Sequence, residues 1–267
     1  MAFQSQLGSM RVFDDSNADE LVKIIRDDDT LGGYIERDFE ANPFGSICPK
    51  FEGDLIPRNE WTDRIEELER NEATLEHLLE YLKMPILDQD QLPYCWCYGF
   101  TGAKMASYGV SGEPIPHLSA TSLAAKVKNY QKVGGWAGEA IAGDLKYGTS
   151  TIDFWPEARL DRRYDTPEQR ADAKLHTVHE YAELPSQSFD AVMTNLLRGH
   201  PTTLGLMWWG HLVFATRPVV ISRNRFGVVI RNSWTERWEN KGRAVLAEEK
   251  ATPHEAFSIR TAKRLAK

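Results

Sequence analysis

One cysteine, one histidine and one asparagine stand where they could cooperate in nucleophilic catalysis. Cys95 lies where a polar loop meets an expected helix, and His211 and Asn232 lie at the ends of short apolar runs in the other half of the chain. A histidine can take the proton of a thiol, and an asparagine oxygen that accepts the other ring N–H fixes the tautomer of that histidine. The three residues predict a thiol nucleophile, although a cysteine taken alone is more often a buried structural residue.

The helix that begins at Cys95 is expected to run to about Ser107. Backbone N–H groups and the helix dipole at its start stabilise a thiolate, so we expect a lowered thiol pKa. Gly99 and Gly102 lie inside this helix, and each costs roughly 1 kcal/mol against alanine. The helix therefore needs tertiary packing, and we expect it to be central and buried, with close neighbours at both glycines.

These residues and their surroundings resemble the papain family of cysteine peptidases. His211 and Asn232 follow Cys95 by 116 and 137 residues, where the family has roughly 130–150, so the first separation is short. The resemblance covers about residues 56–246 and implies an α+β, papain-like fold with two lobes, one helical and one an antiparallel β-barrel-like lobe. The motifs that carry it are Asp88-Gln89, Tyr94-Cys95-Trp96, Gly210-His211 and Asn232-Ser233-Trp234, with Trp238 four residues further on.

The resemblance implies a role for each residue of these motifs. Cys95 would be the nucleophile, His211 its base and Asn232 the residue that orients the base. Gln89 would hold a developing oxyanion together with the amide of Cys95, and removing one such donor typically costs roughly 10²–10³ in rate. Trp234 would shield the Asn232–His211 hydrogen bond from water.

Other residues would support the nucleophile or bind the substrate. Gly134, Gly135 and Trp136 resemble the part of the family's cleft where a peptide backbone pairs in extended form. Trp96 and Trp238 are expected to support the catalytic residues from the side.

Several positions depart from the family's pattern. Leu92 and Lys132 stand where the family has two cysteines of a disulfide. Tyr94 is bulkier than the small residue that usually precedes the nucleophile, and it could narrow the cleft. Residues 1–58 do not resemble the family's long inhibitory propeptide, and the expected helix 62–83 is an insertion.

Composition restricts the classes of partner and compartment. The chain has 267 residues, of which 42% are hydrophobic and 27% charged, as in globular proteins. Its net charge of −7 and the lack of a Lys/Arg cluster argue against nucleic acid and membrane-surface partners. No apolar run approaches the roughly 20 residues of a membrane span, and the first residues lack a classical signal pattern. Three cysteines in a chain of this length argue against a disulfide framework, so we expect a reducing, cytoplasmic compartment.

The apolar pattern predicts helices first and strands later. Residues 1–58 are interpreted as an N-terminal arm that either lies on another surface or is partly flexible, and residues 251–267 as a C-terminal tail. Between them, residues 59–250 form the papain-like domain, with an inserted helix, a helical lobe and a β-rich lobe at 62–83, 88–185 and 186–250. The other expected helices are 18–25, 119–130, 137–146, 166–175 and 189–198, and the expected strands are 202–208, 211–216, 219–222, 226–232 and 243–246.

No metal or organic cofactor is expected. His176 and His179 lie in a segment that alternates like a strand, so their side chains would point to opposite faces. Their spacing also differs from that of the zinc-binding helix motifs.

Two functions of different class follow, with a third as a variant of the first. The first is hydrolysis of a peptide or protein substrate by a Cys-His-Asn mechanism. The second is a structural or binding role on a papain-like scaffold, as a virion-associated head or tail component that contacts other virion subunits, with or without peptidase activity. The arm, the insertion and Tyr94 motivate it, as does a resemblance of residues 56–61 to a bacterial and phage-associated subgroup. The third is acyl transfer to an amine, which the same triad can perform.

Overall fold

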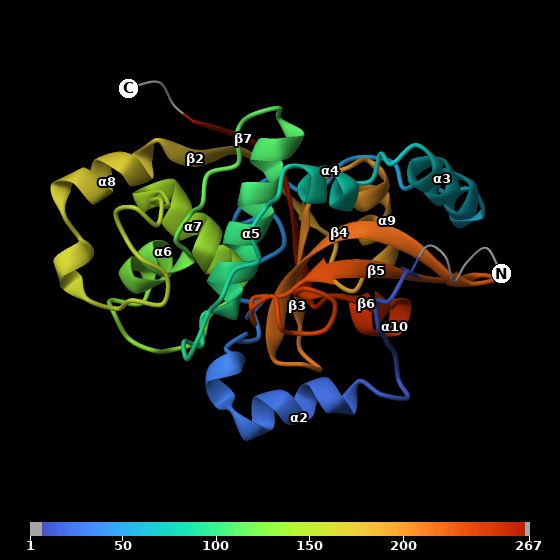
Figure 1. Cartoon of the computed structure of the whole chain (residues 1–267), viewed down its shortest axis with the longest axis horizontal. Coiled ribbons are helices and arrows are strands. Elements are labelled where there is room, and N and C mark those ends of the chain that lie inside the picture. Colours follow the sequence, from blue (N-terminus) through green and yellow to red (C-terminus); the bar gives the residue numbers. More distant parts are fainter. Residues whose placement is uncertain (1–6, 265–267) are drawn as a thin grey trace.

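In the computed structural model, a seven-stranded sheet lies beside a group of helices, and the N-terminal arm passes between them (Figure 1). The structure describes residues 7–264, with the side chains of 177–179 and 261–264 outside the description. The helices are α2 (Asp19–Asp27), η1 (Asp29–Leu31), α3 (Arg58–Arg70), α4 (Leu75–Tyr81), α5 (Cys95–Val110), α6 (Ala120–Val127), α7 (Ala137–Tyr147), η2 (Arg162–Tyr164), α8 (Pro167–Lys174), α9 (Phe189–Leu197) and α10 (Glu248–Ala251). The strands are β1 (Val12–Phe13), β2 (His176–Leu184), β3 (Thr202–Leu206), β4 (His211–Ser222), β5 (Arg225–Arg231), β6 (Arg243–Ala247) and β7 (Glu255–Arg264).

The strands follow the order β1-β6-β5-β4-β3-β7-β2. Every neighbouring pair is antiparallel except β1 with β6, which is parallel. The predicted α+β class is confirmed, but the described strands do not close into a barrel, because β1 and β2 form two separate edges. None of the helices in this part of the chain has the length and apolarity that crossing a membrane would require.

Strand β4 joins two strands that the sequence predicted separately, 211–216 and 219–222. Pro218 lies between them and lacks the N–H that a central strand normally donates. The pairing with β5 shifts its register between Ala215 and Arg217, and such irregularities are where sheets accept proline. The strand therefore continues through the proline.

The single inserted helix predicted for 62–83 is wrong: the structure has two helices, α3 and α4. Glu72 adopts a positive φ of 50°, which ends α3, and the Thr74 side chain accepts a hydrogen bond from the His77 N–H and caps α4. The apolar spacing concealed the break because both helices bury apolar residues. Ile65 packs into one core cluster, whereas Leu79 packs into another.

Most of the described part of the predicted C-terminal tail is a strand. Residues 255–264 form β7, which pairs with β3 on one side and β2 on the other. Phe257 and Ile259 are fully buried, and this two-residue spacing was the available signal. Residues 265–267 of the predicted tail lie outside the described residues.

The described part of the N-terminal arm lies on the chain itself. Val12 and Phe13 extend the sheet beside Val245 and Leu246, and α2 follows. The segment after η1 then enters the space between the helices and the sheet (Figure 1). Residues 1–6 of the predicted arm lie outside the described residues.

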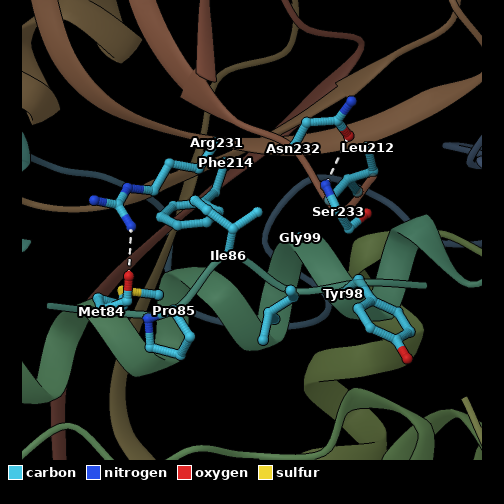
Figure 2. Close-up of a pocket in the computed structure, with 11 residues that line it drawn as sticks. Met84, Pro85, Ile86, Tyr98, Gly99, Leu212, Phe214, Arg231, Asn232 and Ser233 are labelled. Atoms are coloured by element: carbon cyan, nitrogen blue, oxygen red, sulfur yellow. Dashed lines mark hydrogen bonds between the residues drawn. The ribbon is translucent and has the colours of Figure 1, made fainter. Parts of the chain in front are cut away.

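Helix α5 packs directly on β4, and its glycines make this possible. A Cβ on Gly99 would overlap the side chain of Leu212, and one on Gly102 would lie 2.5 Å from the Phe214 ring. Figure 2 shows Gly99 beneath Leu212, at the seam between helix and sheet. The close neighbours predicted at both glycines are confirmed. The seam also brings Cys95, at the start of α5, toward His211, at the start of β4.

A buried carboxylate ties α4 to the sheet. Glu76 accepts hydrogen bonds from Arg231 Nη2 at 2.8 Å, Arg243 Nη1 at 2.9 Å and Thr216 Oγ1 at 2.6 Å. Burial alone would raise the pKa of Glu76, but the charge and hydrogen bonds of Arg231, followed by the hydrogen bonds of Thr216 and Arg243, lower it to about 2. The inserted helices are therefore held by an ion pair as well as by apolar contact.

We expect Glu76→Gln to lower the free energy of unfolding at pH 7 by roughly 3–5 kcal/mol, because it leaves Arg231 buried without its counter-charge. The exposed pair of Glu60 with Arg64 provides the control, since Glu60→Gln should cost no more than about 0.5 kcal/mol.

The stabilisation by Glu76 should also depend on pH. The pKa of Glu76 in the folded chain lies below its unfolded value of 4.5, so the stabilisation is present above pH 4.5 and is lost as the pH falls toward 2. Urea unfolding at both ends of that range measures it. Equal costs for the two variants would contradict the assignment.

Candidate active site

The histidine and asparagine predicted from the sequence form a buried hydrogen-bonded pair. His211 Nε2 lies 2.7 Å from Asn232 Oδ1, and both residues are buried. His211 opens β4 and Asn232 follows β5, and the antiparallel pairing of Phe214 with Arg231 brings these positions together. Among the described residues Nδ1 of His211 forms no hydrogen bond. By accepting this hydrogen bond, Asn232 keeps the ring proton of His211 on Nε2. The other ring nitrogen, Nδ1, is therefore free to accept a proton.

The predicted nucleophile lies beside this pair. Cys95 is the first residue of α5 and is fully buried. Backbone N–H groups of Leu212, Trp96 and Tyr34 interact with its sulfur. Leu212 follows His211 in the chain, so the thiol and the imidazole share one corner of the seam between helix and sheet.

Both groups are neutral in this structure. Burial raises the pKa of Cys95 to about 12, even though the three backbone N–H groups oppose this shift. Burial also lowers the pKa of His211 to about 4, against the opposing effect of its hydrogen bond to Asn232 Oδ1. The lowered thiol pKa expected from the helix start is therefore wrong for this form. Burying a thiolate away from water costs more free energy than the backbone N–H groups and the dipole at the helix start contribute to its stabilisation.

Tryptophans enclose the histidine ring. The centroids of Trp234 and Trp209 lie 4.8 and 4.7 Å from that of His211, and Trp238 packs edge-on against Trp234 at 5.8 Å. Trp234 therefore lies where the sequence predicted its shield, with Trp238 behind it. The second neighbour, Trp209, was not predicted, although it stands two residues before His211.

Gln89 is fully buried and contacts both the site and the arm. Its Oε1 accepts a hydrogen bond from Ser233 Oγ at 2.7 Å. Its Nε2 lies 3.1 Å from the Leu31 carbonyl, 3.2 Å from that of Thr30 and 3.0 Å from that of Leu92. The side-chain N–H groups of Gln89, which were predicted to hold an oxyanion, thus face carbonyl oxygens of the arm and of Leu92.

An extended piece of the arm lies across the cleft. The Gly135 N–H donates to the Gly33 carbonyl at 2.9 Å, and the Ile35 N–H donates to the Gly135 carbonyl at 2.9 Å. On the opposite wall the Tyr34 N–H donates to the Gly210 carbonyl at 3.1 Å. A Cβ on Gly134 would overlap the Gly33 oxygen. The predicted glycine pair therefore already binds an extended peptide, and that peptide is residues 33–35 of the same chain.

The arm closes the catalytic corner completely. Its residues 30–32 face Gln89, the Leu31 carbonyl accepts a hydrogen bond from Trp234 Nε1 at 3.0 Å, and Tyr34 reaches the sulfur of Cys95. This contact was not predicted, because residues 1–58 lack the family's propeptide pattern. A run of Gly32-Gly33 next to an aromatic residue was the only hint of close backbone approach.

Three remaining predicted residues support the cleft wall. Trp96 is fully buried, and a Cβ on Gly135 would lie 2.9 Å from its ring. Trp136 carries the Arg37 guanidinium 5.0 Å above its ring. Tyr94, which the sequence suggested could narrow the cleft, is fully buried and donates its hydroxyl to the Gln131 carbonyl at 2.7 Å.

Within residues 7–264, leaving out the undescribed side chains, no group of three or more His, Cys, Asp and Glu is placed to hold a metal ion. His176 lies 3.7 Å from Asp172 as a buried ion-pair neighbour. The side chain of His179 lies outside the described residues.

We expect Gly33→Ala to loosen the arm. Gly33 has a φ of +115°, and a Cβ there would overlap the carbonyl of Pro93. The backbone N–H groups of Ile35 and Gly135 should then exchange with deuterium at least about tenfold faster. Gly112 is the matched control, because its φ is +73° but a Cβ there meets nothing within 4 Å.

Mass spectrometry or NMR of both full-length variants measures the exchange. Gly112→Ala should leave Ile35 and Gly135 as protected as in the original chain. Unchanged protection in Gly33→Ala would show that the arm is not held by these contacts.

The fold is similar to several solved structures of cysteine proteases. Xylellain, a cysteine protease from Xylella fastidiosa, superposes with a TM-score of 0.65 at 16% identity, over 88% of this chain and 97% of the other. Procathepsin B S9 from Trypanosoma congolense gives 0.58 at 12% identity over 89% and 87%. Digestive procathepsin L 3 from Tenebrio molitor gives 0.53 at 16% identity over 75% and 89%. No protein-family model and no curated protein matches the sequence. At such identities the likeness concerns the fold, and the chain has the papain-like fold.

Proposed function

We propose that this chain is a cysteine peptidase and that the structure is its closed, latent form. The observation that carries the proposal is the His211–Asn232 hydrogen bond, made beside a cysteine at a helix start, with an extended peptide bound across the same corner. A thiol, an oriented imidazole and a peptide-binding backbone are the parts that acyl transfer from a peptide requires.

In the proposed reaction, Cys95, His211 and Gln89 act together on a peptide bond. His211 Nδ1 takes the proton of Cys95, and the sulfur attacks the substrate carbonyl. The oxyanion is held by the amide of Cys95 and by Gln89 Nε2. His211 then gives its proton to the leaving amine as the C–N bond breaks, which leaves a thioester on Cys95. Water, deprotonated by His211, hydrolyses the thioester and restores the thiol.

Latency follows from the arm. Residues 30–35 occupy the positions that a substrate backbone and its oxyanion need, so turnover requires their departure. Residues 52–55, which connect the arm to α3, are all exposed. A cut there would separate the arm from the domain while leaving every predicted catalytic residue in place.

The other hypotheses from the sequence remain predictions. Acyl transfer to an amine would use the same thioester, with an amine in place of water. A virion-associated role, motivated by the arm, the insertion, Tyr94 and the resemblance of residues 56–61 to a bacterial and phage-associated subgroup, also stays a prediction. A reducing compartment is proposed because Cys48, Cys95 and Cys97 are free thiols.

We expect full-length protein carrying Gly33→Ala to hydrolyse a fluorescently labelled, denatured protein substrate. Adding Cys95→Ala should abolish the activity, because no other thiol lies beside His211. Adding Gln89→Ala should lower kcat by roughly 10²–10³-fold through loss of an oxyanion donor.

Cys97→Ala in the same background is the control, since Cys97 is buried and donates to the Ala120 carbonyl away from the histidine. It should retain activity. Hydrolysis that survives Cys95→Ala, or that Cys97→Ala removes while Cys95→Ala does not, would refute the assignment of the nucleophile.

A further inference from the structure

The segment that leads from the inserted helices to the active site is fastened at both of its ends. It follows α4 and ends at Gln89. At its start the Met84 carbonyl accepts a hydrogen bond from Arg231 Nη1 at 3.2 Å, which Figure 2 shows as a dashed line. At its end the Gln89 N–H donates to the Ser233 carbonyl at 2.9 Å. Both ends therefore rest on the short stretch of chain that also carries Asn232.

The inserted helix α4 fixes the guanidinium at the start of this stretch. Arg231 is buried and is the last residue of β5. Its Nη2 lies 2.8 Å from Glu76 Oε1, and its Nε lies 3.0 Å from Glu76 Oε2. A planar guanidinium bound through two nitrogens to one carboxylate has a single orientation. Glu76 therefore determines where the third nitrogen, which donates to Met84, points.

The orientation of Asn232 depends on the same packing. Its N–H donates to the Gly242 carbonyl at 2.9 Å, and Ile86 packs on Gly242, where a Cβ would lie 2.6 Å from the isoleucine side chain. Its Oδ1 lies 2.7 Å from His211 Nε2 and also accepts the N–H of Ser233 at 2.8 Å. A backbone shift at this point would therefore turn the oxygen that holds the histidine.

A freed Arg231 would have a route away from the site. A hollow of about 580 Å³ lies beside α4, and Arg231, Glu80 and Glu236 form part of its lining. Arginine keeps its charge at any ordinary pH, and a buried cation without a counter-charge is costly. Without the carboxylate of Glu76, the guanidinium is expected to turn toward this hollow and to release the Met84 carbonyl.

We infer that Glu76 is a positioning residue of the proposed active site and acts through Arg231. The guanidinium that it holds sets the place of Asn232, which orients the histidine, and of Gln89, which would donate to the oxyanion. The inference rests on the proposed peptidase function. It gives the α3–α4 insertion a part in the chemistry in addition to its part in stability.

The Nε2–H proton of His211 provides a first test that needs no turnover. Its exchange with water is measured by NMR on full-length protein with ¹⁵N-labelled histidine. We expect Glu76→Gln to raise the exchange rate at least about tenfold, because the oxygen of Asn232 no longer stays in place. The matched control is Asp144→Asn, which removes the counter-charge of Lys104 from another fully buried pair, at 2.7 Å. It should leave the exchange unchanged, and equal acceleration in the two variants would overturn the inference.

A second variant keeps the charge and changes only the geometry. Arg231→Lys retains a cation opposite Glu76 and should fold, but one ammonium cannot reproduce the fork that serves both the carboxylate and the Met84 carbonyl. We expect the Nε2–H proton of His211 to exchange at least about threefold faster in this variant. If the lysine chain exchanged as slowly as the unaltered one, the ion pair would be purely stabilising and the inference would be wrong.

Turnover separates the inference from the proposed function. In full-length protein with Gly33→Ala, adding Glu76→Gln should lower kcat for a fluorogenic peptide at least about tenfold and leave KM within about twofold. Adding Asp144→Asn instead should leave kcat unchanged. Circular dichroism at the assay temperature shows whether each chain is folded.

The two proposals fail in different ways. Unchanged kcat in the Glu76→Gln chain, with or without faster exchange at His211, would refute the positioning role and leave the peptidase standing. Faster exchange that is specific to Glu76→Gln, with no turnover in any Gly33→Ala chain, would support the positioning of His211 and refute the peptidase.

Discussion

The contact on which the rest of the site depends is the direct packing of α5 against β4. Gly99 and Gly102 let the helix approach Leu212 and Phe214 without intervening side chains. Because α5 begins with Cys95 and β4 begins just before Leu212, this contact fixes the thiol and the histidine at one corner. Larger residues at the two glycines would separate the lobes and move the nucleophile away from its base. The glycines weaken the helix locally, and nearly complete burial of α5 compensates for that cost.

The second constraint is the exclusion of water by the arm. A thiol and an imidazole that exchange a proton become an ion pair, and an ion pair needs either water or fixed dipoles around it. Backbone N–H groups supply some dipoles around Cys95, but they do not offset its complete burial, and both groups stay neutral. In the proposed latent form, the same contacts would therefore both block a substrate and keep the Cys95 thiol neutral. Release of residues 30–35 would reverse both effects together.

Much of the site could be predicted from residue types and spacing. Cys95, His211 and Asn232 each lie at an element boundary, and boundaries follow from local signals, whereas Gln89 lies in the loop before α5. The break between α3 and α4 was missed since one glutamate with positive φ leaves the apolar spacing unchanged. The role of the arm depends on contacts between residues about 100 positions apart, such as Gly33 with Gly135, and no local pattern encodes those.

The most direct test of this account is the pKa of the Cys95 thiol, measured as the pH dependence of its alkylation rate in full-length protein. In the unaltered chain Cys95 should stay unreactive up to the high pKa of about 12 that burial imposes. With Gly33→Ala the account predicts a pKa below the ordinary thiol value of about 8.5, and adding His211→Ala should return it to that value or above. A thiol that keeps an ordinary or raised pKa after the arm is loosened, whether or not His211 is present, would contradict the claim that this corner is a latent catalytic site.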